Sequence, residues 1–225
     1  MIEKKEVKHP AVYTDSFIPI FAKHLNGFSN VYDPFGGTGK IALIKEHGFS
    51  GEIYCSEIEP EWTNQYDGVD YWFICDSAKT SFIKNEFFEA ICTSPTYGNR
   101  MADHFEAKDS SKRITYRHGL GRKLTDGNTG KQQWGNSYKN KHIEIYNELF
   151  RVLKPEGTFI LNISDHIRAG KIIEVSKWHK EALESIGFNL IESISVPTRR
   201  MGFGENSHLR VQNENIFIFK KVIKV

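Results

Sequence analysis

Apolar and polar residues follow two different patterns along the chain. Short apolar runs such as "NVY" and "GTFILNIS" are typical of buried strands, and recurrence every three or four positions is typical of amphipathic helices. The runs predict seven strands, within 29–35, 51–60, 71–77, 87–93, 157–164, 189–196 and 214–225. The recurrence predicts helices at 14–25, 40–48, 142–157 and 170–188, and the start of another at 59.

The order of these elements predicts the fold class. Strands that alternate with helices indicate an α/β, doubly wound, mostly parallel sheet with helices on both faces. The last two strands have no helix between them, so we expect an antiparallel hairpin at the edge of the seven-stranded sheet. Functional sites in such sheets lie at the carboxyl ends of the strands, near the topological switch point. We expect residues 1–225 to form a single domain.

Composition narrows the class of protein. Apolar residues make up 39% of the chain and aromatic residues 13%, which is enough for a buried core. The three cysteines, Cys55, Cys75 and Cys92, lie singly in apolar stretches, which favours buried reduced thiols over disulfides or a metal site. No run approaches the roughly 20 apolar residues of a membrane span. We therefore expect a cytoplasmic protein with neither a membrane partner nor a metal.

A glycine-rich turn, "DPFGGTGK" at 33–40, follows the first predicted strand. A phosphate-binding Walker loop is excluded, because Pro34 stands where its first glycine belongs and Ile41 where its hydroxyl belongs. The dinucleotide fingerprint fits at Gly37–Ala42, with Glu57 as the acid about 20 residues further on. This pattern predicts an adenosine-containing cofactor without separating NAD from S-adenosylmethionine. A tight turn with no ligand is the alternative.

A second motif, "TSPTYGN" at 93–99, follows the fourth strand and opens on the same edge of the sheet. With it, the sequence resembles the amino-methyltransferases that act on nucleic acids. Their first motif, Asp-Pro-Phe-x-Gly-Ser/Thr-Gly, is matched by Asp33, Pro34, Phe35, Gly37, Thr38 and Gly39. Their second, Ser/Asn/Asp-Pro-Pro-Tyr, is matched by Ser94, Pro95 and Tyr97, with Thr96 in place of the second proline. "HPAVY" at 9–13 is similar to their early cofactor motif, and the order of the two main motifs is permuted.

The resemblance implies a Rossmann-like class I methyltransferase with S-adenosylmethionine as cofactor. Its implied cofactor-binding residues are Asp33, Phe35, Gly37, Thr38, Gly39, Glu57, Ile58 and Asp76. Glu57 would accept the ribose hydroxyls, Ile58 would pack on adenine, and Asp76 would accept the adenine amine. Asp76 could also cap a helix. The implied catalytic residues are Ser94 and Pro95, as acceptors for the target amine, and Tyr97, as a stacking face for the base.

The segment 98–140 breaks the periodicity. It carries nine Lys and Arg against four Asp and Glu, whereas the whole chain has a net charge of only +2. Basic residues interspersed with aromatic ones suit nucleic acid, so we expect double-stranded DNA as a partner. Candidate contacts, which include two arginines of the last hairpin, are Arg100, Arg113, Arg117, Arg122, Lys123, Arg199 and Arg200. A solvated loop is the alternative.

These observations favour a site-specific DNA methyltransferase that modifies an exocyclic base amine. Within the family, serine in the second motif usually accompanies cytosine N4, which makes that amine the favoured target. The alternatives are an N6-adenine enzyme, an RNA guanine-N2 enzyme, a non-catalytic nucleic-acid-binding protein and an NAD oxidoreductase. The sequence leaves open whether a restriction endonuclease accompanies the protein. Asp165 and His166, after the fifth strand, are expected to cap a helix or touch the substrate rather than to form a hydrolase relay.

Overall fold

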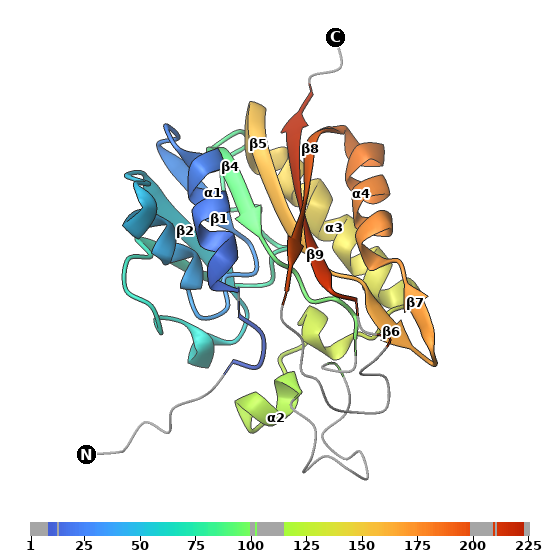
Figure 1. The fold of residues 1–225 in the computed structure, drawn as a ribbon. Helices are drawn as coiled ribbons and strands as arrows, with labels where there is room; N and C mark the ends of the chain where they lie inside the picture. Colours follow the sequence, from blue (N-terminus) through green and yellow to red (C-terminus); the bar gives the residue numbers. More distant parts are fainter. Residues whose placement is uncertain are drawn as a thin grey trace, which may run out of the picture.

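A single seven-stranded sheet forms the centre of the molecule (Figure 1). The structure, a computed structural model, describes residues 9–12, 14–99, 102, 115–198, 209 and 211–222. The strands lie in the order β3-β2-β1-β4-β5-β9-β8. Their bounds are β1 Asn30–Asp33, β2 Glu52–Glu57, β3 Tyr71–Ile74, β4 Phe88–Thr93, β5 Leu153–Ile163, β8 Phe188–Pro197 and β9 Asn213–Lys221.

The pairing confirms the predicted doubly wound topology. β1, β2, β3, β4 and β5 are parallel, and β9 is antiparallel to both β5 and β8. The last two strands therefore pair as predicted, with β8 at the edge and β9 inserted beside β5. The strand order reverses between β1 and β4, so the switch point lies between the ends of these two strands.

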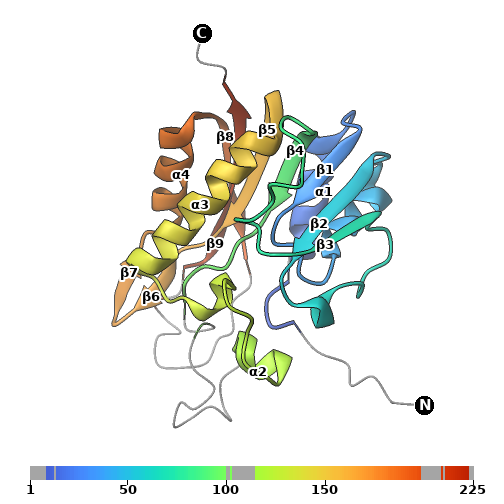
Figure 2. The ribbon, with the colours of Figure 1, turned by 180° about the vertical axis from the view of Figure 1, so that it is seen from behind.

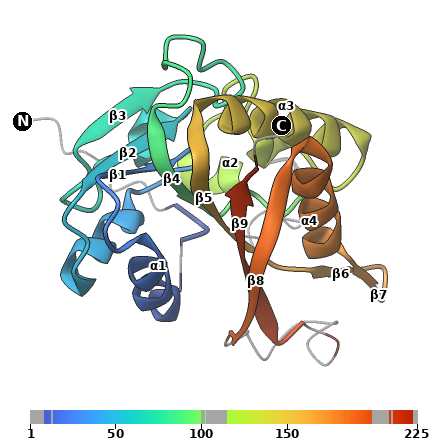
Figure 3. The same cartoon turned by 90° about the horizontal axis from the view of Figure 1, so that it is seen from above.

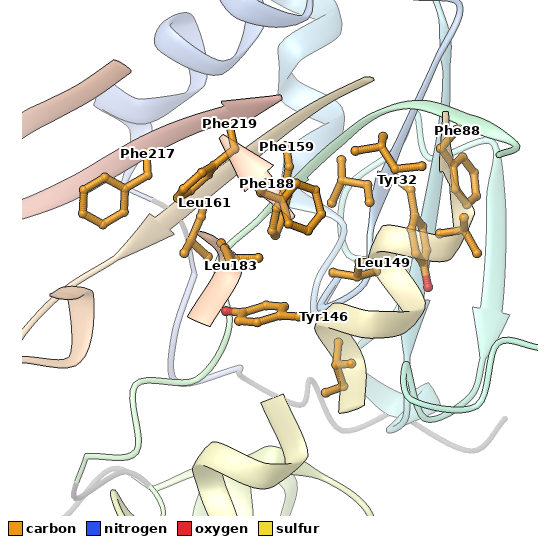
Figure 4. Close-up of a cluster of buried hydrophobic side chains, with 14 of the residues drawn as sticks. Tyr32, Phe88, Tyr146, Leu149, Phe159, Leu161, Leu183, Phe188, Phe217 and Phe219 are labelled. Carbon is orange, nitrogen blue, oxygen red and sulfur yellow. The ribbon is translucent and has the colours of Figure 1, made fainter. Parts of the chain in front are cut away.

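Helices cover both faces of the sheet (Figures 2 and 3). On one face lie α1 Ile18–Leu25 and the 3-10 helix η2 Lys40–His47, and on the other α3 Asn136–Val152 and α4 Val175–Ile186. Each face has its own apolar core, and the core under α3 and α4 is rich in aromatic rings, among them Tyr146, Phe159 and Phe219 (Figure 4). Cys55 and Cys92 are buried free thiols, whereas Cys75 is half-buried. None of the helices in the described part of the chain is long and apolar enough to cross a membrane.

One helix prediction was wrong, and another predicted helix begins later than expected. The segment from 59 forms only a 3-10 turn, η3 Pro60–Trp62. Asn64 then adopts a left-handed φ of 58°, and the backbone N–H groups of Gln65 and Tyr66 both donate to the Thr38 carbonyl, so the chain turns back to the glycine turn. The predicted helix at 170–188 begins only at Val175.

The residues before α4 form a second, two-stranded sheet. β6 His166–Arg168 and β7 Lys171–Ile173 pair as a hairpin. The left-handed φ angles of Ala169 and Gly170, 49° and 72°, make the tight turn that joins them.

The basic segment 98–140 is partly structured. Its described part contains the short helix α2 Tyr116–Leu120, the 3-10 turn η6 Thr129–Lys131 and the first residues of α3. α2 lies beyond the end of the sheet, at the bottom of Figure 1. Helix α3 begins at Asn136 rather than at the predicted 142.

Candidate active site

A cavity of about 510 Å³ opens at the carboxyl ends of β1, β2 and β4. Pro34–Thr38, Ser56–Ile58 and Ser94–Tyr97 all line it, so both sequence motifs face one space. The cavity lies at the switch point, where the sequence predicted a site, and its volume is typical of a small-molecule pocket.

The glycines of the turn serve two purposes. A Cβ on Gly36 would lie 2.7 Å from Cys55 Cβ, and one on Gly39 would lie 3.0 Å from the Trp72 ring, so packing against the protein requires these two glycines. Gly37 differs: it has a left-handed φ of 52° and lines the cavity, and a Cβ there would meet only the His9 ring, at 3.6 Å. Gly37 is therefore the glycine of the turn that leaves room for a ligand, while Gly39 does not line the cavity.

Asp33 lies beneath the turn. It is fully buried and does not line the cavity. Its Oδ1 accepts from Thr93 Oγ1 at 2.6 Å and from the Phe35 N–H at 3.0 Å. The structure thus places this predicted ligand residue in a supporting role, since its carboxylate joins the two motif-bearing strand ends. Phe35 does line the cavity, and its ring stacks on His142.

Glu57 ends β2 and faces the cavity with only 8% of its surface exposed. Oε2 accepts from the Gly37 N–H at 3.0 Å, and Oε1 accepts from the Ile58 and Glu59 N–H groups at 2.8 and 2.9 Å. Burial raises the pKa of Glu57 to about 7, and the three backbone donors oppose this shift. The carboxylate keeps further lone pairs with which it can accept hydroxyl groups.

Asp76 also lines the cavity, but its oxygens already have partners. Oδ1 accepts from the Ala78 N–H at 3.0 Å across a turn, and because no helix follows β3, the alternative role as a helix cap was wrong. Oδ2 accepts from Lys141 Nζ at 2.7 Å. Gly127 lies against Oδ2, where a Cβ would come within 2.6 Å. Asp76 therefore lines the cavity beside Ile58 as a carboxylate that is already paired with Lys141.

Ser94, Pro95 and Tyr97 line the cavity from the end of β4, across the switch point from the ends of β1 and β2. The Tyr97 hydroxyl lies 3.1 Å from Ser94 Oγ and 2.9 Å from Glu214 Oε2. Burial, together with the nearby Glu214 carboxylate, holds the pKa of Tyr97 well above its usual value. Asn162 and Glu214, on β5 and β9, line the same cavity and were missed in the sequence, because they lie in ordinary-looking strands far along the chain.

A cluster of rings from His9, Trp62 and Tyr116 lines another part of the cavity. His9 lies edge-on to Trp62, with ring centroids 4.4 Å apart, and Tyr116 lies 5.7 Å from His9. Burial lowers the pKa of His9 to about 4, so the ring is neutral at physiological pH. The "HPAVY" segment predicted His9 at the site. No local signal marked Trp62 or Tyr116, since each lies in a segment of irregular pattern.

The segment that follows α2 is anchored by Glu59, which is fully buried. Its carboxylate accepts from the Thr125 N–H at 2.6 Å, from Asn128 Nδ2 at 2.9 Å and from Arg122 at 2.8 Å. Arg122 also donates to Glu61, and these carboxylates raise its pKa further above its usual value. The predicted nucleic-acid contact Arg122 therefore holds the segment to the end of β2.

The other predicted nucleic-acid contacts are placed as follows. Lys123 is exposed and Arg117 half-buried, both close to the site end of the sheet. Four more lie outside the described residues: Arg100, Arg113, Arg199 and Arg200. Asp165 accepts from the Ser176 N–H and hydroxyl, so it caps α4 as expected. Within the described ranges, no group of three or more His, Cys, Asp or Glu side chains could hold a metal ion.

The family model described as DNA methylase, of the N6/N4 methyltransferase type, matches residues 88–225. The match includes the Ser94 loop, β9 and the intervening basic segment. The chain belongs to the N6/N4 DNA methylase family. No curated protein is significantly similar to it in sequence. The methylase takes its methyl group from S-adenosylmethionine, as its family does.

Solved structures share the fold of the methylase at low sequence identity. The [4+2]-cyclase SpnF is 14% identical, with a TM-score of 0.58, and the match covers 93% of this chain and 82% of the cyclase. A methyltransferase from Methanosarcina mazei is 13% identical, with a TM-score of 0.56, covering 95% and 99%. The N-methyltransferase NodS from Bradyrhizobium japonicum, in complex with S-adenosyl-L-homocysteine, is 10% identical, with a TM-score of 0.52, covering 92% and 84%. These similarities confirm the predicted Rossmann-like class I methyltransferase fold.

The cavity of the methylase fits the cofactor. The left-handed Gly37 leaves open space beside the turn, where a side chain would project toward His9. Glu57 presents carboxylate oxygens 20 positions after Gly37, as an acceptor for ribose hydroxyls. Ile58 supplies an apolar face on the same wall. We expect Glu57 and Ile58 to hold the adenosine part and the Gly37 backbone to lie against the methionine part.

Cofactor binding should depend on pH through Glu57. With a pKa of about 7, its carboxyl group is mostly protonated at pH 6 and mostly ionised at pH 8. Hydroxyl donors prefer the ionised acceptor, so we expect calorimetry to give an affinity about tenfold lower at pH 6 than at pH 8. His9 stays neutral over this range, because its pKa is about 4.

Glu57→Gln is the matched control, because its amide does not titrate. Its ratio of affinities at the two pH values should lack the Glu57 contribution and be correspondingly smaller. Equal ratios for the wild-type protein and the variant would remove Glu57 from the cofactor site.

Proposed function

We propose that the methylase transfers a methyl group from S-adenosylmethionine to an exocyclic amine of a DNA base, with cytosine N4 as the favoured target. The observation that carries this proposal is the shared cavity. The Gly37 turn and Glu57 line it from the ends of β1 and β2, and Ser94, Pro95 and Tyr97 line it from the end of β4, beyond the switch point. A base amine placed at the end of β4 would therefore share the cavity with a cofactor held at the ends of β1 and β2.

Methyl transfer to a base amine depends on how the amine is positioned against the methyl group. An exocyclic base amine is a poor nucleophile because its lone pair is delocalised into the ring. The bound cofactor supplies an electrophilic methyl group. Ser94 Oγ and the Pro95 carbonyl would accept the two amine hydrogens, draw the nitrogen toward tetrahedral geometry and direct its lone pair at the methyl group. Tyr97 would present its ring to the base once the base has left the stack.

The loop keeps a defined shape although Thr96 replaces the usual second proline. The Tyr138 hydroxyl donates to the Thr96 carbonyl at 2.5 Å, and the Trp134 N–H donates to the Gly98 carbonyl at 2.7 Å. The same hydroxyl lies 2.7 Å from His179 Nε2, inside the core. The Tyr138 side chain of α3 and the backbone of Trp134, just before that helix, therefore support the loop, which argues against a disrupted site and a purely binding protein.

Cytosine N4 is favoured because serine in the second motif usually accompanies that target in the family that the sequence resembles. Ser94 is neutral, so it accepts from the amine without placing a second charge directly against the base. The N6-adenine and RNA guanine-N2 activities are the alternatives, and the family membership favours DNA over RNA. The cytoplasmic location, the site-specific recognition and a place in a restriction–modification system stay predictions.

Replacing Ser94 should separate binding from chemistry. We expect Ser94→Ala to retain its affinity for cofactor and duplex DNA, but to slow single-turnover transfer by ~10²-fold, because the lost interaction matters mainly in the transition state. Ser81→Ala, at an exposed position before β4, is the control and should behave as the wild type.

Mass spectrometry of the digested DNA identifies the product. N4-methylcytosine is expected, and N6-methyladenine alone would contradict the serine argument. Modification of transfer RNA without any DNA product would move the enzyme to the RNA class.

The basic segment offers a test of DNA binding. Lys123 is exposed beside the Glu59-anchored turn, whereas Lys84 is equally exposed near the start of β4, at the opposite end of the sheet. We expect Lys123→Glu to weaken DNA binding and to lower the slope of log affinity against log salt by ~1, as for one lost phosphate contact. Lys84→Glu makes the same charge change and should leave both quantities unaltered. An equal effect of the two variants would mean that net charge, not this surface, determines binding.

A further inference from the structure

A hydrogen-bond chain begins at Ser94 and ends at Glu214. Ser94 Oγ lies 3.1 Å from the Tyr97 hydroxyl, which donates to Glu214 Oε2 at 2.9 Å. Glu214 lies on β9 and is only 6% exposed, yet it lines the same cavity as Ser94. The chain therefore connects the proposed amine acceptor to a buried carboxylate.

The carboxylate fixes the direction of the protons along this chain. An ionised Glu214 can only accept, and a phenol has a single proton. The Tyr97 hydroxyl therefore donates its one hydrogen bond to Glu214. The Tyr97 oxygen must then accept from the Ser94 hydroxyl. With its proton directed at Tyr97, Ser94 Oγ keeps its lone pairs for the hydrogens of a base amine.

Asn162 fits the same direction. Its amide oxygen is placed 3.3 Å from the Tyr97 oxygen, whose proton is already taken, and its nitrogen has no partner among the described residues. Turning the amide by 180° makes the nitrogen a donor to the Tyr97 oxygen. The phenol oxygen then receives two hydrogen bonds and makes one.

We infer that Glu214 is a positioning residue and the final proton acceptor of the transfer reaction; this inference rests on the proposed function. As the new N–CH3 bond forms and the sulfonium C–S bond breaks, the amine nitrogen becomes positively charged. Its surplus proton moves to Ser94 Oγ, the Ser94 proton moves to the Tyr97 oxygen, and the Tyr97 proton moves to Glu214. The step ends with a neutral methylated base, a neutral thioether and a neutral carboxylic acid.

Charge compensation supports the direction of this step. The positive charge passes from sulfur to nitrogen, and the negative carboxylate at the end of the chain cancels it when the proton arrives. Opposite charges attract more strongly around a buried carboxylate such as Glu214 than in solvent. The proton is lost to solvent before the next turnover, which completes the balance.

The other described acids of the cavity bind partners outside the Ser94 loop. Of the described acidic side chains that line it, Glu57 accepts from the glycine turn and Asp76 pairs with Lys141. Glu214 alone among these three is hydrogen-bonded to the Ser94 loop. Asp165, close to the same strand ends, caps α4 through Ser176.

Two variants and their combination test the inference. Glu214→Gln removes the proton acceptor while keeping the size of the side chain. Tyr97→Phe breaks the chain while keeping the ring that would stack on the base. We expect each to slow single-turnover methyl transfer to duplex DNA by ~10²-fold, a typical contribution of general acid–base catalysis, with the KM for DNA and the Kd for cofactor within about twofold of wild type. The double variant should be no slower than the slower single variant, because both changes interrupt one chain.

Glu181→Gln, on the exposed side of α4, is the matched control and should keep the wild-type rate. A Glu214→Gln protein with the wild-type rate, or single effects that multiply in the double variant, would overturn the inference. If Glu214→Gln does not fold, Tyr97→Phe decides alone: an unaltered rate overturns the chain, and a slow rate with unaltered KM supports it. A wild-type protein that methylates no nucleic acid overturns the proposed function and the inference with it, whereas active wild type with an undisturbed Glu214→Gln rate overturns the inference only.

Discussion

The hydrogen bond between Asp33 and Thr93 is the contact on which the site depends. It joins the ends of β1 and β4, two neighbouring parallel strands whose loops carry the two sequence motifs. A buried carboxylate is costly without donors, and Asp33 obtains them from the Thr93 hydroxyl and the Phe35 backbone. A one-residue slip of β4 would turn Thr93 to the other face of the sheet, so this bond can form only when β4 pairs with β1 in the observed register. From this point the two loops diverge and line one cavity.

Two carboxylates of the cavity differ in what surrounds them. Glu57 receives three backbone N–H groups at the end of β2, which suits a fixed acceptor for a ligand. Glu214 accepts a hydrogen bond from the Tyr97 hydroxyl and so is connected to the loop that would hold the base. The shared fold does not decide between such uses, since a [4+2]-cyclase has the same architecture. Function is carried by the loops at the strand ends.

The sequence predicted the sheet and the location of the site, because both depend on local patterns. Apolar runs mark the strands. The Gly37–Glu57 spacing corresponds to a hydrogen bond between two residues only 20 positions apart, at the ends of neighbouring strands. The β6–β7 hairpin was missed because its strands are three residues long and its turn lies in a segment of helical periodicity. Glu214 was missed because it is 117 positions from Tyr97, and β9 reaches that loop only through its pairing with β5. The motif predicted Asp33 as a cofactor residue, and its complete burial beneath the turn is a tertiary feature that the motif does not reveal.

A crystal structure of the methylase with S-adenosyl-L-homocysteine is the most direct test of the claim that the two motif loops form one transfer site. The account predicts adenosine beside Glu57 and Ile58, and a sulfur atom that faces Ser94 Oγ and the Pro95 carbonyl across a gap that a base amine would fill. A sulfur atom directed away from the Ser94 loop, or a cofactor bound outside this cavity, would contradict it.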